Sequence, residues 1–293
     1  MAVFSLSSLS TPPAVYSVNL ATNEMHLLFQ PRYAAELPLG KAEFITYKSF
    51  DGLTIPAFLV LHNGRWERRP SVVWVHGGPW WEVGDEWSAA IQALSVAGFH
   101  VLCPNFRGST GYGSDFVRMN IGDPGGGDMQ DVFYGVRYLY EIGLVDDERV
   151  GIAGASYGGF MTFLAMTKYP DVWKAGAAIV GVTDWVEDYE LADAAFRHFT
   201  EQLLAKPQEK PELFRDKSPI NFVHQIKAPI LVWHRANDTR CPLQPVEKFV
   251  EKLKELGKQH EFYVIEGEGH GVQKVENCVK QYKTVTDFLL RHL

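Results

Sequence analysis

Apolar runs and helical patterns alternate along most of the chain. The run at 71–75 (SVVWV) is almost continuously apolar, as expected for a strand covered on both faces. The segment 127–140 instead places apolar residues at spacings of three and four, which predicts a helix with one buried face. By the same criteria, strands are predicted at 99–103, 149–153, 175–180, 229–234 and 261–265, and helices at 87–97, 156–168, 183–216, 245–256 and 274–291.

This order of elements predicts an α/β fold. Consecutive parallel strands need a crossover connection, for which a helix is the usual solution. Near-continuous apolar strands indicate that helices cover both faces of the sheet. We therefore expect an open, mostly parallel, twisted sheet with helices on both faces, preceded by an antiparallel pair at 44–47 and 54–61 around the turn Asp51-Gly52.

The beginning of the chain has a different character. Segment 5–13 is rich in Ser, Thr and Pro, so we expect an irregular lead-in. Segments 15–20 and 25–29 flank a polar turn and predict a short β-hairpin. Because a lone hairpin is only marginally stable in water, this one must pack on the main body or on another chain, as in a homo-oligomer.

Length and turn residues set the expected domain boundaries. The chain has 293 residues, which suits one large α/β domain or two small ones. Pro31 and the stretch 36–40 (ELPLG) mark a linker. We therefore divide the chain into an N-terminal extension with hairpin and linker, residues 1–40, and a main domain, residues 41–293.

The charge balance excludes some partners. Lys and Arg number 28 against 35 Asp and Glu, a net charge of −7, so there is no basic excess to neutralise phosphates. No apolar run reaches the roughly 18 residues of a membrane span, and the N-terminus lacks the features of a secretory signal. We expect neither a nucleic-acid nor a membrane partner.

The cysteines and the glycine-rich motif predict no bound group. Cys103, Cys241 and Cys278 are widely separated and form no CxxC pair, which argues against disulfides or zinc and favours a reducing compartment. Residues 124–128 (PGGGD) lack the GxxxxGK[ST] pattern and do not follow a strand, so they predict a flexible loop rather than a phosphate cradle. We expect a cytoplasmic protein with no metal or other cofactor.

A candidate nucleophile lies between a predicted strand and a predicted helix. The sequence Gly154-Ala155-Ser156-Tyr157-Gly158 has the GxSxG pattern in the context of a nucleophile elbow, where small residues permit a sharp turn and expose the serine hydroxyl. A helix N-terminus at this point favours developing negative charge. The alternative is a glycine-rich turn with an incidental serine.

A serine nucleophile needs a base that an acid holds in one orientation. The chain order expected for this architecture is Ser, then Asp or Glu, then His. Asp238 and His270 each follow a predicted strand, at the sheet edge where α/β folds bind ligands. Alternatively, Asp238 is an Asx-turn residue and His270 a surface-loop histidine, with Asp184 and Glu266 as substitute acids.

The intermediate of acyl transfer also needs donors for its oxyanion. One is expected to be the N–H of Tyr157, the residue after the nucleophile. The second should come from the loop His76-Gly77-Gly78-Pro79, which follows the strand at 71–75, and we favour the Gly78 N–H. The alternative for this loop is a plain tight turn.

Several aromatic residues lie in segments close to these motifs. Trp80, Trp81, Trp87, Trp185 and Tyr189 either line an apolar substrate pocket or belong to the core. Of these, we take Trp80 and Trp185 as candidate substrate-binding residues.

Five motifs in order along the chain resemble the catalytic domain of the prolyl oligopeptidase family, and the HGGP version is most similar to acylaminoacyl peptidases. They are HGGP at 76–79, NFRGSTGYG at 105–113, GASYGGF at 154–160, NDTR at 237–240 and GEGHG at 267–271. The resemblance implies an α/β-hydrolase fold with Ser156, Asp238 and His270 as the triad. It also implies that Arg240 holds a substrate carbonyl; the alternative is a surface ion pair.

Members of that family carry a long N-terminal β-propeller, for which this sequence has no room, and residues 14–30 resemble the last hairpin of one. The resemblance implies a serine hydrolase, a serine-type peptidase that acts through an acyl-enzyme on short N-acylated or blocked peptides and small carboxylic esters. One alternative is a stand-alone carboxylesterase with little peptidase activity. Another is a catalytically silent hydrolase fold used as a binding module.

Overall fold

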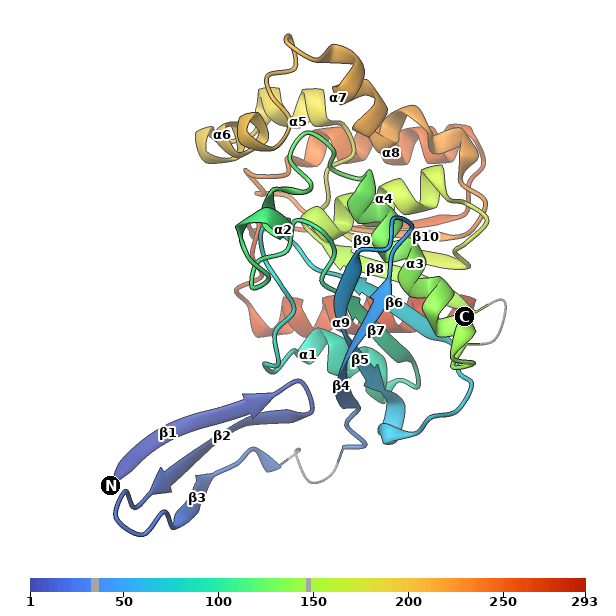
Figure 1. Ribbon diagram of the computed structural model, residues 1–293. Coiled ribbons are helices and arrows are strands. Elements are labelled where there is room, and N and C mark those ends of the chain that lie inside the picture. Colours follow the sequence, from blue (N-terminus) through green and yellow to red (C-terminus); the bar gives the residue numbers. More distant parts are fainter. Residues whose placement is uncertain (33–36, 146–148) are drawn as a thin grey trace.

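Eight strands form the central sheet of the computed structural model, which describes residues 1–32, 37–145 and 149–293 (Figure 1). Their order across the sheet is β11-β10-β9-β8-β6-β7-β5-β4. Strands β6 to β11 run parallel, whereas β5 pairs antiparallel with β7 and with β4. The strands are β4 (Lys41–Lys48), β5 (Thr54–Leu61), β6 (Ser71–Val75), β7 (His100–Pro104), β8 (Val150–Ala155), β9 (Ala175–Ile179), β10 (Ile230–Arg235) and β11 (His260–Ile265).

Helices cover both faces of this sheet, as the sequence predicts (Figure 1). One face packs against α1 (Ala89–Val96) and α9 (Val275–His292). The other packs against α3 (Gly127–Glu141), α4 (Tyr157–Lys168) and α8 (Leu243–Glu255). Further helical elements of the described residues are α2 (Ser114–Arg118), α5 (Trp185–Leu191), α6 (Ala194–Leu203), α7 (Pro211–Lys217), and the short 3₁₀ turns His62–Gly64, Pro219–Asn221 and Val223–Gln225.

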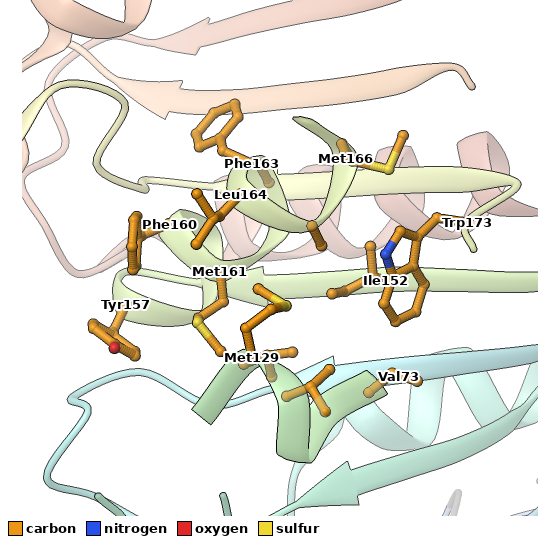
Figure 2. Close-up of a cluster of buried hydrophobic side chains, with 14 of the residues drawn as sticks. Val73, Met129, Ile152, Tyr157, Phe160, Met161, Phe163, Leu164, Met166 and Trp173 are labelled. Carbon is orange, nitrogen blue, oxygen red and sulfur yellow. The ribbon is translucent and has the colours of Figure 1, made fainter. Parts of the chain in front are cut away.

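Helix α4 is the most deeply buried helix of the core. Every residue from 157 to 167 is buried, because the helix is apolar around most of its circumference. Figure 2 shows its side chains packed around Val73 of β6, Ile152 of β8 and Met129 of α3. Each large apolar side chain buried in this way contributes roughly 1.5–3 kcal/mol, so the segment after β8 is held firmly.

The order of the strands creates a crevice at one edge of the sheet. Strand β6 lies between β7 and β8, so the chain leaves β6 toward β7 and later returns on the other side to form β8. The loops that follow β6 and β8 therefore diverge at their carboxyl ends, which is where open α/β sheets bind ligands.

A second, three-stranded antiparallel sheet precedes the main sheet and projects from it (Figure 1). It consists of β1 (Ala2–Ser8), β2 (Thr11–Val18) and β3 (Met25–Phe29). Its contact with the main body is made at the β1–β2 turn, where Leu9 is fully buried and its N–H donates to Asp85 Oδ1 at 2.8 Å. Gln92 Nε2 of α1 donates to the Leu9 carbonyl at 2.5 Å. The turn is thus pinned to the main domain.

The N-terminal segment corrects one expectation. The hairpin predicted at 15–20 and 25–29 is confirmed as part of β2 and β3, but the irregular lead-in at 5–13 is wrong, because β1 and the start of β2 occupy it. The pairing shifts between Leu6↔Ala14 and Ser8↔Thr11, so Pro12 and Pro13 lie at a bulge, where proline is tolerated in a sheet.

Other expectations here stay open. The linker expected at 36–40 begins outside the described residues. The division at residue 40 and a homo-oligomer through the hairpin stay predictions. Among the described residues, no helix combines the length and the apolar character that crossing a bilayer requires.

Candidate active site

Ser156 lies at the sharp turn between β8 and α4. Its backbone has φ 59° and ψ −118°, a conformation that costs a non-glycine residue free energy. A Cβ added at Gly154 would lie 2.6 Å from the carbonyl oxygens of Gly158 and Val75, and one at Gly158 would lie 2.0 Å from the Val75 oxygen. Only glycine fits at either position, which explains the two glycines of the motif.

The structure brings Ser156, His270 and Asp238 together from three separate loops. His270 Nε2 lies 2.9 Å from Ser156 Oγ, and His270 Nδ1 lies 2.8 Å from Asp238 Oδ2. The loops follow β8, β10 and β11, so all three residues lie at the carboxyl edge of the sheet. This arrangement can move a proton from the hydroxyl to the imidazole while the carboxylate holds the ring.

The surroundings of Asp238 keep it ionised. Its side chain is fully buried, and its second oxygen accepts the N–H groups of Arg240 and Cys241 at 3.0 Å each. Burial raises the pKa of Asp238, but the hydrogen bond and charge of His270 and the Cys241 amide outweigh it, so this pKa lies below its usual value.

The two substitute acids have other places. Asp184 caps α5, where its Oδ1 accepts the N–H of Val186 at 3.0 Å. Glu266 is exposed on the loop after β11. The carboxylate that is hydrogen-bonded to His270 is that of Asp238.

Polar side chains hold the His270 loop, and sequence reasoning missed them. The Arg235 guanidinium donates to the His270 carbonyl and, at 2.9 Å, to Gln281 Oε1 of α9. The Glu268 carboxylate accepts two backbone amides of its own loop at 3.1 Å and Asn277 Nδ2 at 2.7 Å. Arg235 and Glu268 are only 5% and 2% exposed. The motif GEGHG predicted a role for His270 and a bent loop at its glycines, but no role for its second residue, Glu268.

The loop after β6 lies directly against the nucleophile. A Cβ added at Gly77 would lie 3.4 Å from the Ser156 Cβ, and Gly78 has φ +114°, a conformation that favours glycine. The first N–H groups of a helix have no intrahelical acceptor, so the Tyr157 amide at the start of α4 is available to a ligand. Gly77 thus lies against Ser156, and Gly78 lines the same cavity as Ser156.

Two further histidines near the site have structural contacts. The His76 ring stacks on Phe106 with centroids 4.2 Å apart, and its Nε2 lies 2.9 Å from Ser109 Oγ. His234 Nε2 lies 2.9 Å from the Cys241 carbonyl. Burial lowers the pKa of both histidines to about 4, so they are neutral near pH 7.

A cavity of about 570 Å³ opens beside Ser156 and His270. Its other walls come from the loop after β6, from α6 and from the loop after β10; they include Gly78, Trp81, Phe196, Phe199 and Arg240. The cavity is thus mainly apolar, with one guanidinium at its rim.

Arg240 lies at this cavity, as the resemblance implies, whereas Trp80 and Trp185 do not line it. Trp185 is 1% exposed, because the capped start of α5 turns it into the core, where it stacks on Phe196 with centroids 6.3 Å apart. Trp80 packs edge-on against Phe199. The two tryptophans support the wall from behind. Phe196 and Phe199, which line the wall, were not predicted from the sequence; their spacing of three residues on one helix is the signal that could have indicated them.

Among the described residues, no group of three or more His, Cys, Asp or Glu side chains could hold a metal ion.

Comparison with known proteins gives a family match and distant relatives. A model of the prolyl oligopeptidase family matches residues 86–293. The chain is 29% identical over 303 residues to dipeptidyl aminopeptidase BIII of Pseudoxanthomonas mexicana, in an alignment that covers 98% of this chain and 44% of that protein. It is 29% identical over 235 residues to the acylamino-acid-releasing enzyme of Arabidopsis thaliana, which covers 76% of this chain and 30% of that protein.

A solved structure extends the likeness to three dimensions. The structure described as acylaminoacyl peptidase in complex with Z-Gly-Gly-Phe-chloromethyl ketone aligns with a TM-score of 0.89 at 28% identity, over 99% of this chain and 48% of that one. The α/β-hydrolase fold is therefore confirmed. The chain spans half or less of the length of these three relatives.

Proposed function

The chain belongs to the prolyl oligopeptidase family, and from that premise we propose that it is a serine hydrolase that works through an acyl-enzyme. The observation that carries this proposal is the hydrogen-bonded series Asp238–His270–Ser156, with distances of 2.8 and 2.9 Å. The three side chains suit the roles of nucleophile (Ser156), base (His270) and acid (Asp238).

The reaction starts when Ser156 Oγ bonds to the substrate carbonyl carbon and its proton passes to His270 Nε2. Asp238 stabilises the resulting imidazolium, and the Tyr157 and Gly78 amides hold the oxyanion. His270 then gives the proton to the leaving amine or alcohol as the bond to it breaks. Water, activated by the same imidazole, releases the acid product from Ser156.

The cavity supports substrates with an apolar side chain and a blocked amino end. Phe196, Phe199 and Trp81 offer apolar contacts, and the Arg240 guanidinium suits a substrate carbonyl. No Asp or Glu is among the described residues that line this cavity, so nothing there would pair with a free α-ammonium group. Short N-acylated peptides and small carboxylic esters fit this chemistry best, and a similar protein has been solved in complex with Z-Gly-Gly-Phe-chloromethyl ketone.

Three substrates test this choice on one preparation: N-acetyl-Phe p-nitroanilide, Phe p-nitroanilide with a free amine, and p-nitrophenyl butyrate. We expect kcat/KM for the acetylated anilide to exceed that for the free amine by at least tenfold. Hydrolysis of the ester alone would favour the carboxylesterase alternative. Hydrolysis of none of them would favour the silent binding module.

Arg240→Met separates the roles further. Losing the guanidinium should raise KM for the acetylated anilide, which has a second carbonyl to bind, more than KM for the butyrate ester. Equal changes for the two substrates would contradict the carbonyl-binding role of Arg240.

A further inference from the structure

The glycine-rich loop at 124–128 has no part in the chemistry described so far, yet it packs tightly beside the nucleophile helix. A Cβ added at Gly125 would lie 2.2 Å from Leu164 Cδ2 and 3.0 Å from Phe160 Cζ, both on α4. One at Gly127 would lie 2.8 Å from Arg107 Cδ. Gly125 therefore lets the loop before α3 lie against α4, and Gly127 lets the start of α3 lie against Arg107.

This approach brings Asp128 to Tyr157. The Tyr157 hydroxyl donates to Asp128 Oδ2, and the other carboxylate oxygen accepts the Met129 N–H at 2.8 Å. Asp128 is fully buried and Tyr157 is 3% exposed. Figure 2 shows Tyr157 at the first turn of α4, with Met129 of α3 nearby. A buried hydrogen bond thus joins the first turns of the two helices.

Tyr157 is also the residue whose N–H is assigned to the oxyanion. Its ring packs on Phe106 and Phe160, with centroids 6.1 and 5.3 Å apart. Because the ring and the amide share one Cα at the helix start, fixing the ring restricts the direction of the N–H. The geometry points to Asp128 as a positioning residue that orients the Tyr157 amide toward the oxyanion through the phenol, an inference that rests on the proposed function.

Stability alone accounts poorly for this carboxyl group. Burial raises the pKa of Asp128 to about 7, although the Tyr157 hydroxyl and two backbone amides lower it. Its ionised form is thus costly to keep in the core. An oxyanion donor is worth on the order of 10²- to 10³-fold in turnover, so accurate placement of one is a functional reason to keep a carboxyl group that costs stability.

Tyr157→Phe removes the hydrogen bond, and Asp128→Asn replaces its charged acceptor with a weaker, neutral amide oxygen; both keep the shape and therefore test the inference. We expect kcat on the acetylated anilide to fall about tenfold in each, since small misplacements of reacting groups are costly, while KM changes less than twofold. Affinity for a phenylalanine-like boronic acid, which forms a tetrahedral adduct on Ser156, should fall by the same factor as kcat/KM. The double variant should be no slower than the worse single variant.

Tyr169→Phe is the matched control, since Gln130 Nε2 of α3 donates to its hydroxyl at 2.6 Å at the far end of α4. It removes a similar link between the same two helices and should leave kcat unchanged. Comparable losses in all three variants, or kcat within twofold of the parent in both Tyr157→Phe and Asp128→Asn, would overturn the inference.

The melting temperature of each variant shows whether it is folded. If Tyr157→Phe does not fold, the kinetics of Asp128→Asn alone test the inference. Failure of the proposed function looks different: Ser156→Ala would then keep full activity, or the parent protein would have none, and the positioning role would fall with it.

Discussion

The nucleophile and the base of the proposed site are held in different ways. Ser156 is fixed by backbone packed on backbone: Gly154 and Gly158 lie so close to Val75 that no side chain fits, and residues 157–167 of α4 behind them are buried. Its position is therefore part of the packing that stabilises the fold.

His270 depends on polar side chains instead. Its side chain is 21% exposed, and a Cβ added at Gly271 would meet nothing within 4 Å. Hydrogen bonds from Arg235 and to Glu268 and Asp238 hold its loop. Changes on the nucleophile side should therefore cost mainly stability, whereas changes on the base side should cost mainly activity, with a smaller loss of stability.

The largest effect on activity is expected from Asp238→Asn. An amide at this position cannot stabilise the imidazolium and favours the wrong tautomer of His270, so kcat should fall on the order of 10⁴-fold. Steady-state kinetics and thermal unfolding check this together. If the free energy of unfolding fell by as many kcal/mol as the activation free energy rose, the contrast between the two sides of the site would be contradicted.

Gly158→Ala tests the nucleophile side against Gly271→Ala on the base side. The new Cβ at 158 would lie 2.0 Å from the Val75 oxygen, so we expect the free energy of unfolding to fall by roughly 3 kcal/mol or more. The alanine at 271 enters open space and should change it by less than about 0.5 kcal/mol. Chemical denaturation measures both, and equal losses would contradict the account.

Arg235→Lys should have a smaller effect. A lysine keeps the charge but cannot reach both the His270 carbonyl and Gln281 with one rigid fork. We expect kcat to fall about tenfold while KM is retained. Arg291→Lys is the control, because Arg291 forms an exposed ion pair with Glu261 far from the site. Unchanged kcat in Arg235→Lys would show that the loop holds itself.

The smallest expected effect is a pH dependence of stability from Glu268. Hydrogen bonds from Asn277 and two backbone amides hold the pKa of Glu268 below its usual value despite partial desolvation. A lowered folded-state pKa means that this stabilisation is present above the unfolded pKa and is lost as pH falls through the folded one.

Glu268→Gln should therefore melt below the parent at pH 7, and the difference should shrink in acid as the pH falls through the folded-state pKa of Glu268. Glu266→Gln, at an exposed position on the same loop, should match the parent at both pH values. A melting difference for Glu268→Gln that persists unchanged in acid would contradict the assignment.

Much of the fold could be predicted because it rests on local patterns. Periodicity located the strands of the main sheet, and chain order with strand ends located Ser156, Asp238 and His270. Strand β1 escaped prediction because its pairing depends on a bulge that accommodates Pro12 and Pro13, and no local pattern reveals such a bulge.

The supporting residues escaped for a related reason. Arg235 and Gln281 meet across 46 positions of sequence, and only the folded chain shows that they hold the same loop. Trp185 was chosen as a candidate because of its residue type. The cap at Asp184 sets the start of α5 so that Trp185 faces the core, and Phe196 lines the cavity instead. Which face of a short helix meets a ligand depends on packing between elements.

Reaction of the folded protein with a fluorophosphonate tests the central claim most directly, because it requires Ser156 to be activated by His270. Intact mass should show one adduct per chain, peptide mapping should place it on Ser156, and Ser156→Ala should neither gain the adduct nor hydrolyse p-nitrophenyl butyrate. No adduct on the folded parent, an adduct on another serine, or normal hydrolysis by Ser156→Ala would contradict the account.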